Sequence, residues 1–248
     1  MQCQILSWEK GDGRMKYTAV ILSGGKGSRM NSEVHKQYLL LNGKPVIAYA
    51  LEVFEKSPVD EIVLVTGAGE EEYCRKEIVE AYHLKKVVKI VAGGKERYHS
   101  VYEGLKAVEE SDYVLIHDGA RPFVTRDIIC RTMEEVQRSS ACVVGMHVKD
   151  TIKITDEADY VRDTPDRKDV WMVQTPQAFS YLLILSAYQK LIEQEKTTVT
   201  DDAMAVEKMS GVPVKLIEGS YRNIKITTPE DMVIAEAFLQ AQSNNCEK

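Results

Sequence analysis

The chain has 248 residues, of which 44% are hydrophobic and 28% charged, a composition typical of a soluble globular protein. This length suits one large α/β domain or two small ones. The net charge of -6 argues against non-specific binding of nucleic acid, and no apolar run approaches the ~20 residues of a membrane span. We therefore expect neither a nucleic-acid nor a membrane partner.

The five cysteines are scattered along the chain, and no pair has the spacing of metal ligands. This distribution favours reduced thiols and a cytoplasmic location over a disulfide framework. Residues 1–14 are polar and rich in glycine, and they precede the first strand-like run. We expect residues 1–14 to be a dispensable extension, residues 15–242 to form a single domain, and residues 243–248 to be a tail.

From residue 17 onward, apolar runs of strand length alternate with helical patterns. The first predicted strands cover residues 17–22, 61–66, 87–93 and 141–148, with one more that begins at residue 112 and runs into a turn. The helices predicted between them cover residues 45–56, 70–83, 100–110 and 125–139. This β-α-β-α order predicts an α/β fold with a mainly parallel sheet flanked by helices on both faces.

The pattern changes near His147. Residues 147–170 contain short alternating pieces, many charges and a central turn-like TDEAD, so they are too polar for a core. We interpret them as a protruding β-hairpin arm. The pattern alone leaves open whether the arm packs on a partner subunit or is a solvated excursion.

After the arm, the α/β pattern returns. Further helices are predicted over residues 181–194, 200–211 and 228–242, and further strands over residues 212–219 and 222–227. The predicted helix caps are Thr125, Thr200 and Thr228 at N-termini and Gly211 at a C-terminus. No internal repeat or low-complexity linker divides the chain.

Three clusters of unusual composition each follow a predicted strand. They read GGKGSRM at residues 24–30, GGKER at residues 93–97 and HDGARP at residues 117–122. Ligands of parallel α/β sheets bind beyond the carboxyl ends of the strands. We therefore expect the three clusters to form one site.

The first cluster has the properties of a phosphate-binding loop. Glycine after a strand allows close approach to a ligand, and successive free amides form a concave anion site. The Walker pattern is absent, and the dinucleotide fingerprint fails because Met30 stands where its third glycine belongs, which disfavours a dehydrogenase. Arg29 and Lys36 could reach a polyphosphate on the loop and stabilise charge on a transferring phosphoryl group.

The other two clusters add a metal candidate and more cations. Asp118 follows an apolar strand and precedes a small-residue turn, a position that suits a ligand of Mg²⁺. Arg121 could serve a second phosphate, and Arg97 lies near another glycine turn. His117 is predicted to be structural.

Motifs spread in order along the chain resemble the 2-C-methyl-D-erythritol 4-phosphate cytidylyltransferase family of the non-mevalonate isoprenoid pathway. They are LSGGKGSRM with KQY, the spaced GG, R and S of the second cluster, HDGARPF, VKDTIK, TPQ, TDDA and NIKIT. The similarity runs from about Tyr17 to Leu239. Ser23 and Gly119 stand where alanine is common in the family, and neither change removes a charged group.

The resemblance implies a Rossmann-like nucleotidyltransferase fold that transfers the CMP moiety of CTP to 2-C-methyl-D-erythritol 4-phosphate and releases pyrophosphate, with Mg²⁺ or another divalent cation. The catalytic cations implied at the CTP phosphates are Arg29, Lys36 and Lys225, and the implied metal ligand is Asp118. The residues implied to hold CTP are Ser23, Gly24, Gly25, Gly27, Gly94, Arg97 and Ser100.

The resemblance also gives the arm a role, because in the family it clasps the arm of a second subunit. Thr151 and Arg167 would then bind the sugar-alcohol phosphate across the interface of a homodimer, with Arg121 and Thr175 completing the pocket. Three alternatives stay open: a sister enzyme that acts on ribitol 5-phosphate, a catalytically silent nucleotide-binding module, and a dehydrogenase.

Overall fold

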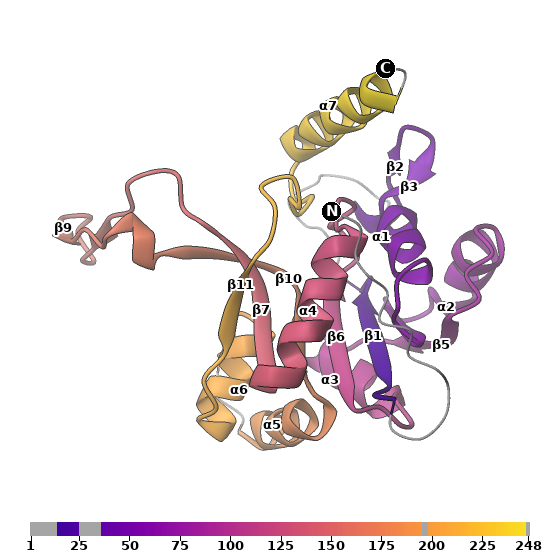
Figure 1. Ribbon diagram of the computed structural model, residues 1–248, viewed down its shortest axis with the longest axis horizontal. Helices are drawn as coiled ribbons and strands as arrows, with labels where there is room; N and C mark the ends of the chain where they lie inside the picture. Colours follow the sequence, from indigo (N-terminus) through magenta and orange to yellow (C-terminus); the bar gives the residue numbers. More distant parts are fainter. Residues whose placement is uncertain (1–13, 25–35, 195–197, 247–248) are drawn as a thin grey trace.

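The computed structural model describes residues 14–24, 36–194 and 198–246. Its main sheet has seven strands in that described part of the chain (Figure 1). In spatial order they are β11 (Lys215–Glu218), β7 (Ala141–His147), β10 (Trp171–Ser180), β6 (Tyr113–Asp118), β1 (Tyr17–Leu22), β4 (Glu61–Thr66) and β5 (Val87–Ala92). All neighbouring pairs are parallel except those that β10 makes with β6 and β7. The predicted α/β fold with a mainly parallel sheet is confirmed.

Helices cover both faces of this sheet. The α- and π-helices of the described residues are α1 (Val46–Glu55), α2 (Glu71–Tyr73), η2 (Cys74–Glu80), α3 (Arg97–Ala107), α4 (Arg126–Ser139), α5 (Tyr181–Glu193), α6 (Asp202–Ser210) and α7 (Pro229–Cys246). Helix α7 packs against β2 (Leu40–Leu41) and the start of α1 rather than on the main sheet. Helices α1, α4 and η2 pack on one face, and α3, α5 and α6 pack on the other. Strands buried on both faces read as continuous apolar runs, which is why residues 61–66 were recognisable from sequence alone.

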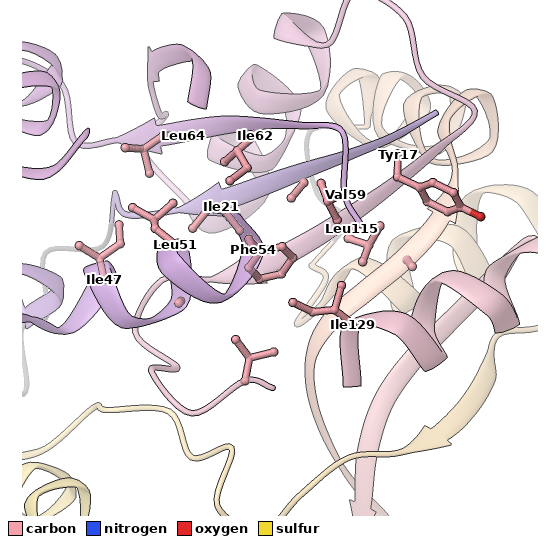
Figure 2. Close-up of a cluster of buried hydrophobic side chains, with 14 of the residues drawn as sticks. Tyr17, Ile21, Ile47, Leu51, Phe54, Val59, Ile62, Leu64, Leu115 and Ile129 are labelled. Carbon is pink, nitrogen blue, oxygen red and sulfur yellow. The ribbon is translucent and has the colours of Figure 1, made fainter. Parts of the chain in front are cut away.

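The core alternates along each central strand. In β1, Ala19 and Ile21 face the α1 and α4 side, whereas Val20 faces the α3 and α5 side. Figure 2 shows the first of these layers, where Ile21 and Leu115 lie close to Leu51 and Phe54 of α1. The loops at the carboxyl edge of the sheet therefore begin from strands that are packed on both faces.

The predicted arm is present between β7 and β10. It contains the antiparallel pair β8 (Ile154–Thr155) and β9 (Val161–Asp163) and the short helix η3 (Arg167–Asp169), and it projects from the sheet (Figure 1). A second small hairpin, β2 (Leu40–Leu41) with β3 (Lys44–Pro45), follows the short helix η1 (Lys36–Tyr38).

Three local predictions were wrong. Strand β10 was not expected, because Gln174, Thr175 and Gln177 interrupt its apolar pattern. Residues 222–227 do not form a strand but an irregular segment. The helix predicted over residues 70–83 is present, as a single α-turn continued by the π-helix η2.

The third error concerns α6, whose N-cap is Asp201 rather than Thr200. The Asp201 side chain accepts the backbone N–H of Met204 at 2.9 Å. Gly211 ends the same helix with φ 68°, and Thr125 caps α4, both as predicted. Among the helices within the described ranges, none is both long and apolar enough to cross a membrane.

Candidate functional site

A pocket of about 740 Å³ lies at the carboxyl edge of the sheet, where β1, β4, β5 and β6 end. The sheet register aligns the ends of the two central strands, because Leu22 of β1 pairs with Asp118 of β6. The pocket is lined by Leu22, Ser23, Gly24, Gln37, Gly67, Ala68, Gly93, Gly94, Lys95, Glu96, Arg97, Ser100, Asp118, Ala120 and Lys225. The described parts of all three predicted clusters therefore meet in one place.

Backbone packing leaves little room for a side chain at two glycines on the floor of this pocket. A Cβ added to either Gly24 or Gly93 would lie 3.1 Å from the carbonyl oxygen of Thr66, closer than ordinary van der Waals contact. The backbone N–H of Gly93 donates to that same carbonyl at 2.7 Å, and the Gly94 N–H donates to Ser100 Oγ at 3.1 Å. Close backbone approach thus keeps the pocket wall free of side chains.

Ser23 is fixed from the side of η1. Its backbone N–H donates to Val65 O at 2.6 Å, and its hydroxyl donates to the hydroxyl of Tyr38 at 3.0 Å. The side-chain amide of Gln37 donates to the carbonyl of Ser23. The KQY motif thus anchors the point at which the glycine cluster leaves β1.

Asp118 carries the charge at the centre of the pocket. Lys225 Nζ lies 2.7 Å from its Oδ2, and Arg97 Nε lies 3.3 Å from its Oδ1. Burial alone would raise the pKa of the Asp118 carboxyl, but Arg97, Lys225 and Arg121 hold it well below its usual range. The carboxylate is therefore ionised and already balanced by cations.

Lys225 reaches Asp118 because residues 222–227 cross the end of β6 instead of joining the sheet. The N–H of Ile226 donates to Ala120 O at 2.8 Å, and the buried side chain of Asn223 donates to Thr175 O at 2.9 Å. Arg121 holds the same segment by donating to Asn223 O at 2.8 Å. Residues 222–227 were predicted to be a strand, and these hydrogen bonds take the place of the ones that it would have made with a neighbouring strand.

His117 and Thr175 lie behind the carboxylate. Thr175 Oγ1 accepts the backbone N–H of Asp118 at 3.1 Å and lies 2.9 Å from His117 Nδ1. His117 Nε2 faces Arg121 O at 3.2 Å, so the neutral ring with its proton on Nε2 satisfies both bonds. Burial lowers the pKa of His117 to about 4, which agrees with the structural role predicted for it.

The predicted site residues divide into three groups. The pocket brings together Ser23, Gly24, Gly94, Arg97, Ser100, Asp118 and Lys225. Arg121 and Thr175 lie beside it, where Arg121 contacts Asn223 and Thr175 contacts His117 and Asp118. Thr151 and Arg167 lie on the arm and do not line the pocket. Gly25, Gly27, Arg29 and the side chain of Lys36 fall outside the described residues.

The donor set is compatible with a magnesium ion. In the described part of the chain, no cluster of three or more histidine, cysteine or acidic side chains forms a metal cage. Mg²⁺ does not need one, since it binds through one or two carboxylates, phosphate oxygens and retained waters. Asp118, ionised and facing the pocket, fits that pattern.

Comparisons with known proteins agree with this geometry. The profile of the IspD family, described as 2-C-methyl-D-erythritol 4-phosphate cytidylyltransferase, matches residues 17–241. This chain belongs to that family. A relative of that name from Lachnospira eligens is 52% identical over 90% of this chain and 99% of its own length. Another from Lachnoclostridium phytofermentans is 47% identical over 91% and 97%.

Solved structures agree on the fold of the family. The crystal structure of 4-diphosphocytidyl-2C-methyl-D-erythritol synthase from Anaerococcus prevotii superposes with a TM-score of 0.81 at 36% identity, covering 91% of this chain and 96% of that one. The cytidylyltransferase from Thermus thermophilus superposes with a TM-score of 0.73 at 30% identity, covering 91% and 100%. The predicted nucleotidyltransferase fold is confirmed.

Two residues around the pocket were not singled out from sequence. Gln177 and Asp202 belong to the TPQ and TDDA motifs, but both are buried and neither lines the pocket. One signal could have marked Asp202. Two adjacent acids, Asp201 and Asp202, stand at the start of α6, and the N-cap needs only the first.

Proposed function

We propose that this chain transfers the CMP moiety of CTP to 2-C-methyl-D-erythritol 4-phosphate, giving 4-diphosphocytidyl-2-C-methyl-D-erythritol and pyrophosphate. One observation carries the proposal beyond family membership. The pocket joins side-chain-free glycine backbone to an ionised acid, Asp118, flanked by two cations. Such a site suits a polyphosphate and its counter-cation.

The chemistry needs charge stabilisation more than proton transfer. A phosphate oxygen of the acceptor attacks the α-phosphorus of CTP in line, and the bond from the α-phosphorus to the bridging oxygen of pyrophosphate breaks. The acceptor phosphate is already an anion at neutral pH, so no strong base is required. The barrier is the approach of two anions, which fixed cations relieve.

Lys225 is the described cation best suited to the α-phosphate. Its ammonium is paired with Asp118, and its side chain lines the pocket and is 34% exposed. A lysine on a flexible stem can exchange that partner for a phosphate oxygen without unfolding anything. Arg29 and Lys36 are proposed to hold the remaining phosphates. Replacing either by alanine should lower kcat by roughly 10²-fold or more.

Asp118 is the residue proposed to hold Mg²⁺. Bound there together with phosphate oxygens, the ion would supply positive charge against the negative charge of the triphosphate. Gly94, which follows β5, and Ser100, on α3, both line the pocket, and we assign them to the nucleotide. Polar groups placed to form hydrogen bonds with one base discriminate against bases that lack the matching groups.

The arm is proposed to complete the active site of a second subunit. Exposed apolar side chains concentrate on it and on the adjoining start of β10: Ile154, Tyr160, Val161, Met172 and Val173. Apolar surface of this kind favours burial against another chain. Thr151 and Arg167 would then face the acceptor phosphate of the partner site in a two-fold homodimer.

Pyrophosphate release by the purified protein tests the proposed reaction. CTP and Mg²⁺ are supplied with methylerythritol phosphate in one reaction and ribitol 5-phosphate in another. We expect turnover at least tenfold higher with methylerythritol phosphate. Preference for ribitol 5-phosphate would assign the sister activity, and CTP binding without pyrophosphate release would contradict an enzymatic function.

A further inference from the structure

A buried carboxylate outside the pocket controls one of the pocket's cations. The side chain of Asp202, at the start of α6, is 0% exposed. Arg97 donates to it through both terminal nitrogens, NH1 to Oδ1 at 2.8 Å and NH2 to Oδ2 at 2.7 Å. The hydroxyl of Tyr188, on α5, donates to the same Oδ1. This two-pronged geometry is the strongest form of an arginine–carboxylate pair.

Gln177 holds Asp202 in place from the sheet. Its side-chain carbonyl accepts the backbone N–H groups of Asp202 and Ala203, each at 3.0 Å, and its amide donates to Asp201 at 3.1 Å. Gln177 is itself buried in β10. The TPQ and TDDA motifs therefore form one unit, which fixes the N-terminus of α6 against the sheet.

The pair with Asp202 occupies the two-pronged end of the Arg97 guanidinium. One N–H of each terminal nitrogen is on Asp202, and the Nε–H faces Asp118 Oδ1 at 3.3 Å. Burial alone would lower the pKa of Arg97, but Asp202 and Asp118 raise it well above its ordinary value. Binding a phosphate through both terminal nitrogens would require Arg97 to release Asp202. Leaving that fully buried carboxylate without its partner is strongly unfavourable.

Lys225 differs from Arg97 in this respect. Among the described residues it makes a single ion pair, with Oδ2 of Asp118, and Arg97 remains beside that carboxylate if Lys225 leaves. When a triphosphate enters, Lys225 can move to it while Arg97 stays. Of the two cations beside Asp118, Lys225 is therefore available to the nucleotide, whereas Arg97 stays bound to Asp202.

We propose that Asp202 is a positioning residue, which locks Arg97 across Asp118 and so fixes the orientation of that carboxylate toward the metal–nucleotide complex. The inference rests on the proposed function. It changes the role expected of Arg97 from a direct nucleotide ligand to a support for Asp118. Partners of metal-binding side chains commonly contribute 10–100-fold in metal affinity or activity.

The test is Asp202→Asn, with Glu207→Gln as the matched control. Both remove one negative charge from α6, but Glu207 is exposed. CTP binding is measured by calorimetry with and without Mg²⁺, in the absence of acceptor, so that no turnover occurs. We expect the factor by which Mg²⁺ tightens CTP binding to fall by about tenfold or more in Asp202→Asn and to stay within twofold in Glu207→Gln.

A double-mutant cycle separates positioning from a general loss of structure. Because Asp202 is proposed to act only through Arg97, Arg97→Gln combined with Asp202→Asn should lose no more of the magnesium effect than Arg97→Gln alone. Losses that multiply would overturn the proposal, as would a magnesium effect in Asp202→Asn equal to that of the control.

Tyr188→Phe keeps the test decisive if Asp202→Asn does not fold. This change removes one hydrogen bond to Asp202 and no charge. It should reduce the magnesium effect in the same direction by at least about twofold, and an unchanged effect would overturn the proposal. The wild-type pyrophosphate assay is separate, so failure of the proposed function is recognised independently of these variants.

Discussion

The ammonium of Lys225 lies 2.7 Å from Asp118 Oδ2, although the two residues come from distant parts of the chain. One ends the central strand β6, and the other lies in an irregular segment that crosses the end of that strand. Their contact joins the residue proposed to hold the metal to the residue proposed to hold the α-phosphate. The pair therefore gives the first two predictions.

Lys225→Gln should lower kcat by about 10²-fold or more while changing the KM for CTP much less, because the lost charge acts mainly on the transition state. Steady-state kinetics measure both constants. Lys215→Gln, on the exposed position of β11, is the control and should retain turnover. A variant of Lys225 with near wild-type kcat would remove this residue from the mechanism.

Asp118→Asn should abolish most of the activity and shift the magnesium requirement. The amide keeps the size of the side chain but supplies no charge to a divalent cation, and it leaves Lys225 without its ion pair. We expect kcat to fall by about 10²-fold or more, and the Mg²⁺ concentration for half-maximal rate to rise. Activity within fivefold of wild type at low Mg²⁺ would argue against Asp118 as a metal ligand.

The buried ring of His117 makes the fold sensitive to mild acid. Its pKa is about 4 in the folded state, compared with an ordinary 6.5. Between these values the unfolded chain binds a proton that the folded chain does not, so stability falls as the pH drops from 6.5 toward 4. Between pH 7.5 and pH 5, this histidine should account for about 2 kcal/mol of lost stability.

Urea unfolding at the two pH values measures this loss. His117→Gln keeps polar atoms near Thr175 and Arg121 but has no proton to gain in this range. The variant should therefore lose less stability on acidification than the wild type. Equal losses in the two proteins would show that His117 does not titrate between folded and unfolded states.

The apolar tip of the arm should determine the oligomeric state. Val161 is 57% exposed on β9. Val161→Asp would place a charge in the proposed contact between subunits, so we expect a smaller species in analytical ultracentrifugation and lower turnover at low protein concentration. Leu182→Asp is the matched control, since Leu182 is 74% exposed on α5, away from the arm. A Val161→Asp variant that assembles like this control would contradict the dimer proposal.

The strands that could be predicted are those whose neighbours on both faces are apolar. Residues 61–66 are one example, since all but the first are buried and no polar group interrupts the run. Strand β10 was not predicted because two of its residues are polar. The side chains of Thr175 and Gln177 accept hydrogen bonds from the backbone of Asp118 and of α6. A polar residue that is satisfied by a distant segment looks, in sequence, like a loop residue.

The site was predictable where its chemistry is local. The strand-ending position of Asp118 and the paired glycines at residues 93 and 94 follow from short motifs. The role of Asp202 is not local, because it depends on the guanidinium of Arg97 coming from another helix. The course of residues 222–227 was missed for a related reason, since its hydrogen bonds go to Ala120 and Thr175 rather than to a neighbouring strand.

The most direct measurement is a crystal structure of the protein with CTP and Mg²⁺ in the absence of acceptor. We predict the triphosphate in the pocket at the ends of β1 and β6, with the α-phosphate against Lys225, the metal on Asp118, and the fork of Arg97 still on Asp202. A triphosphate bound away from this pocket would contradict the central claim.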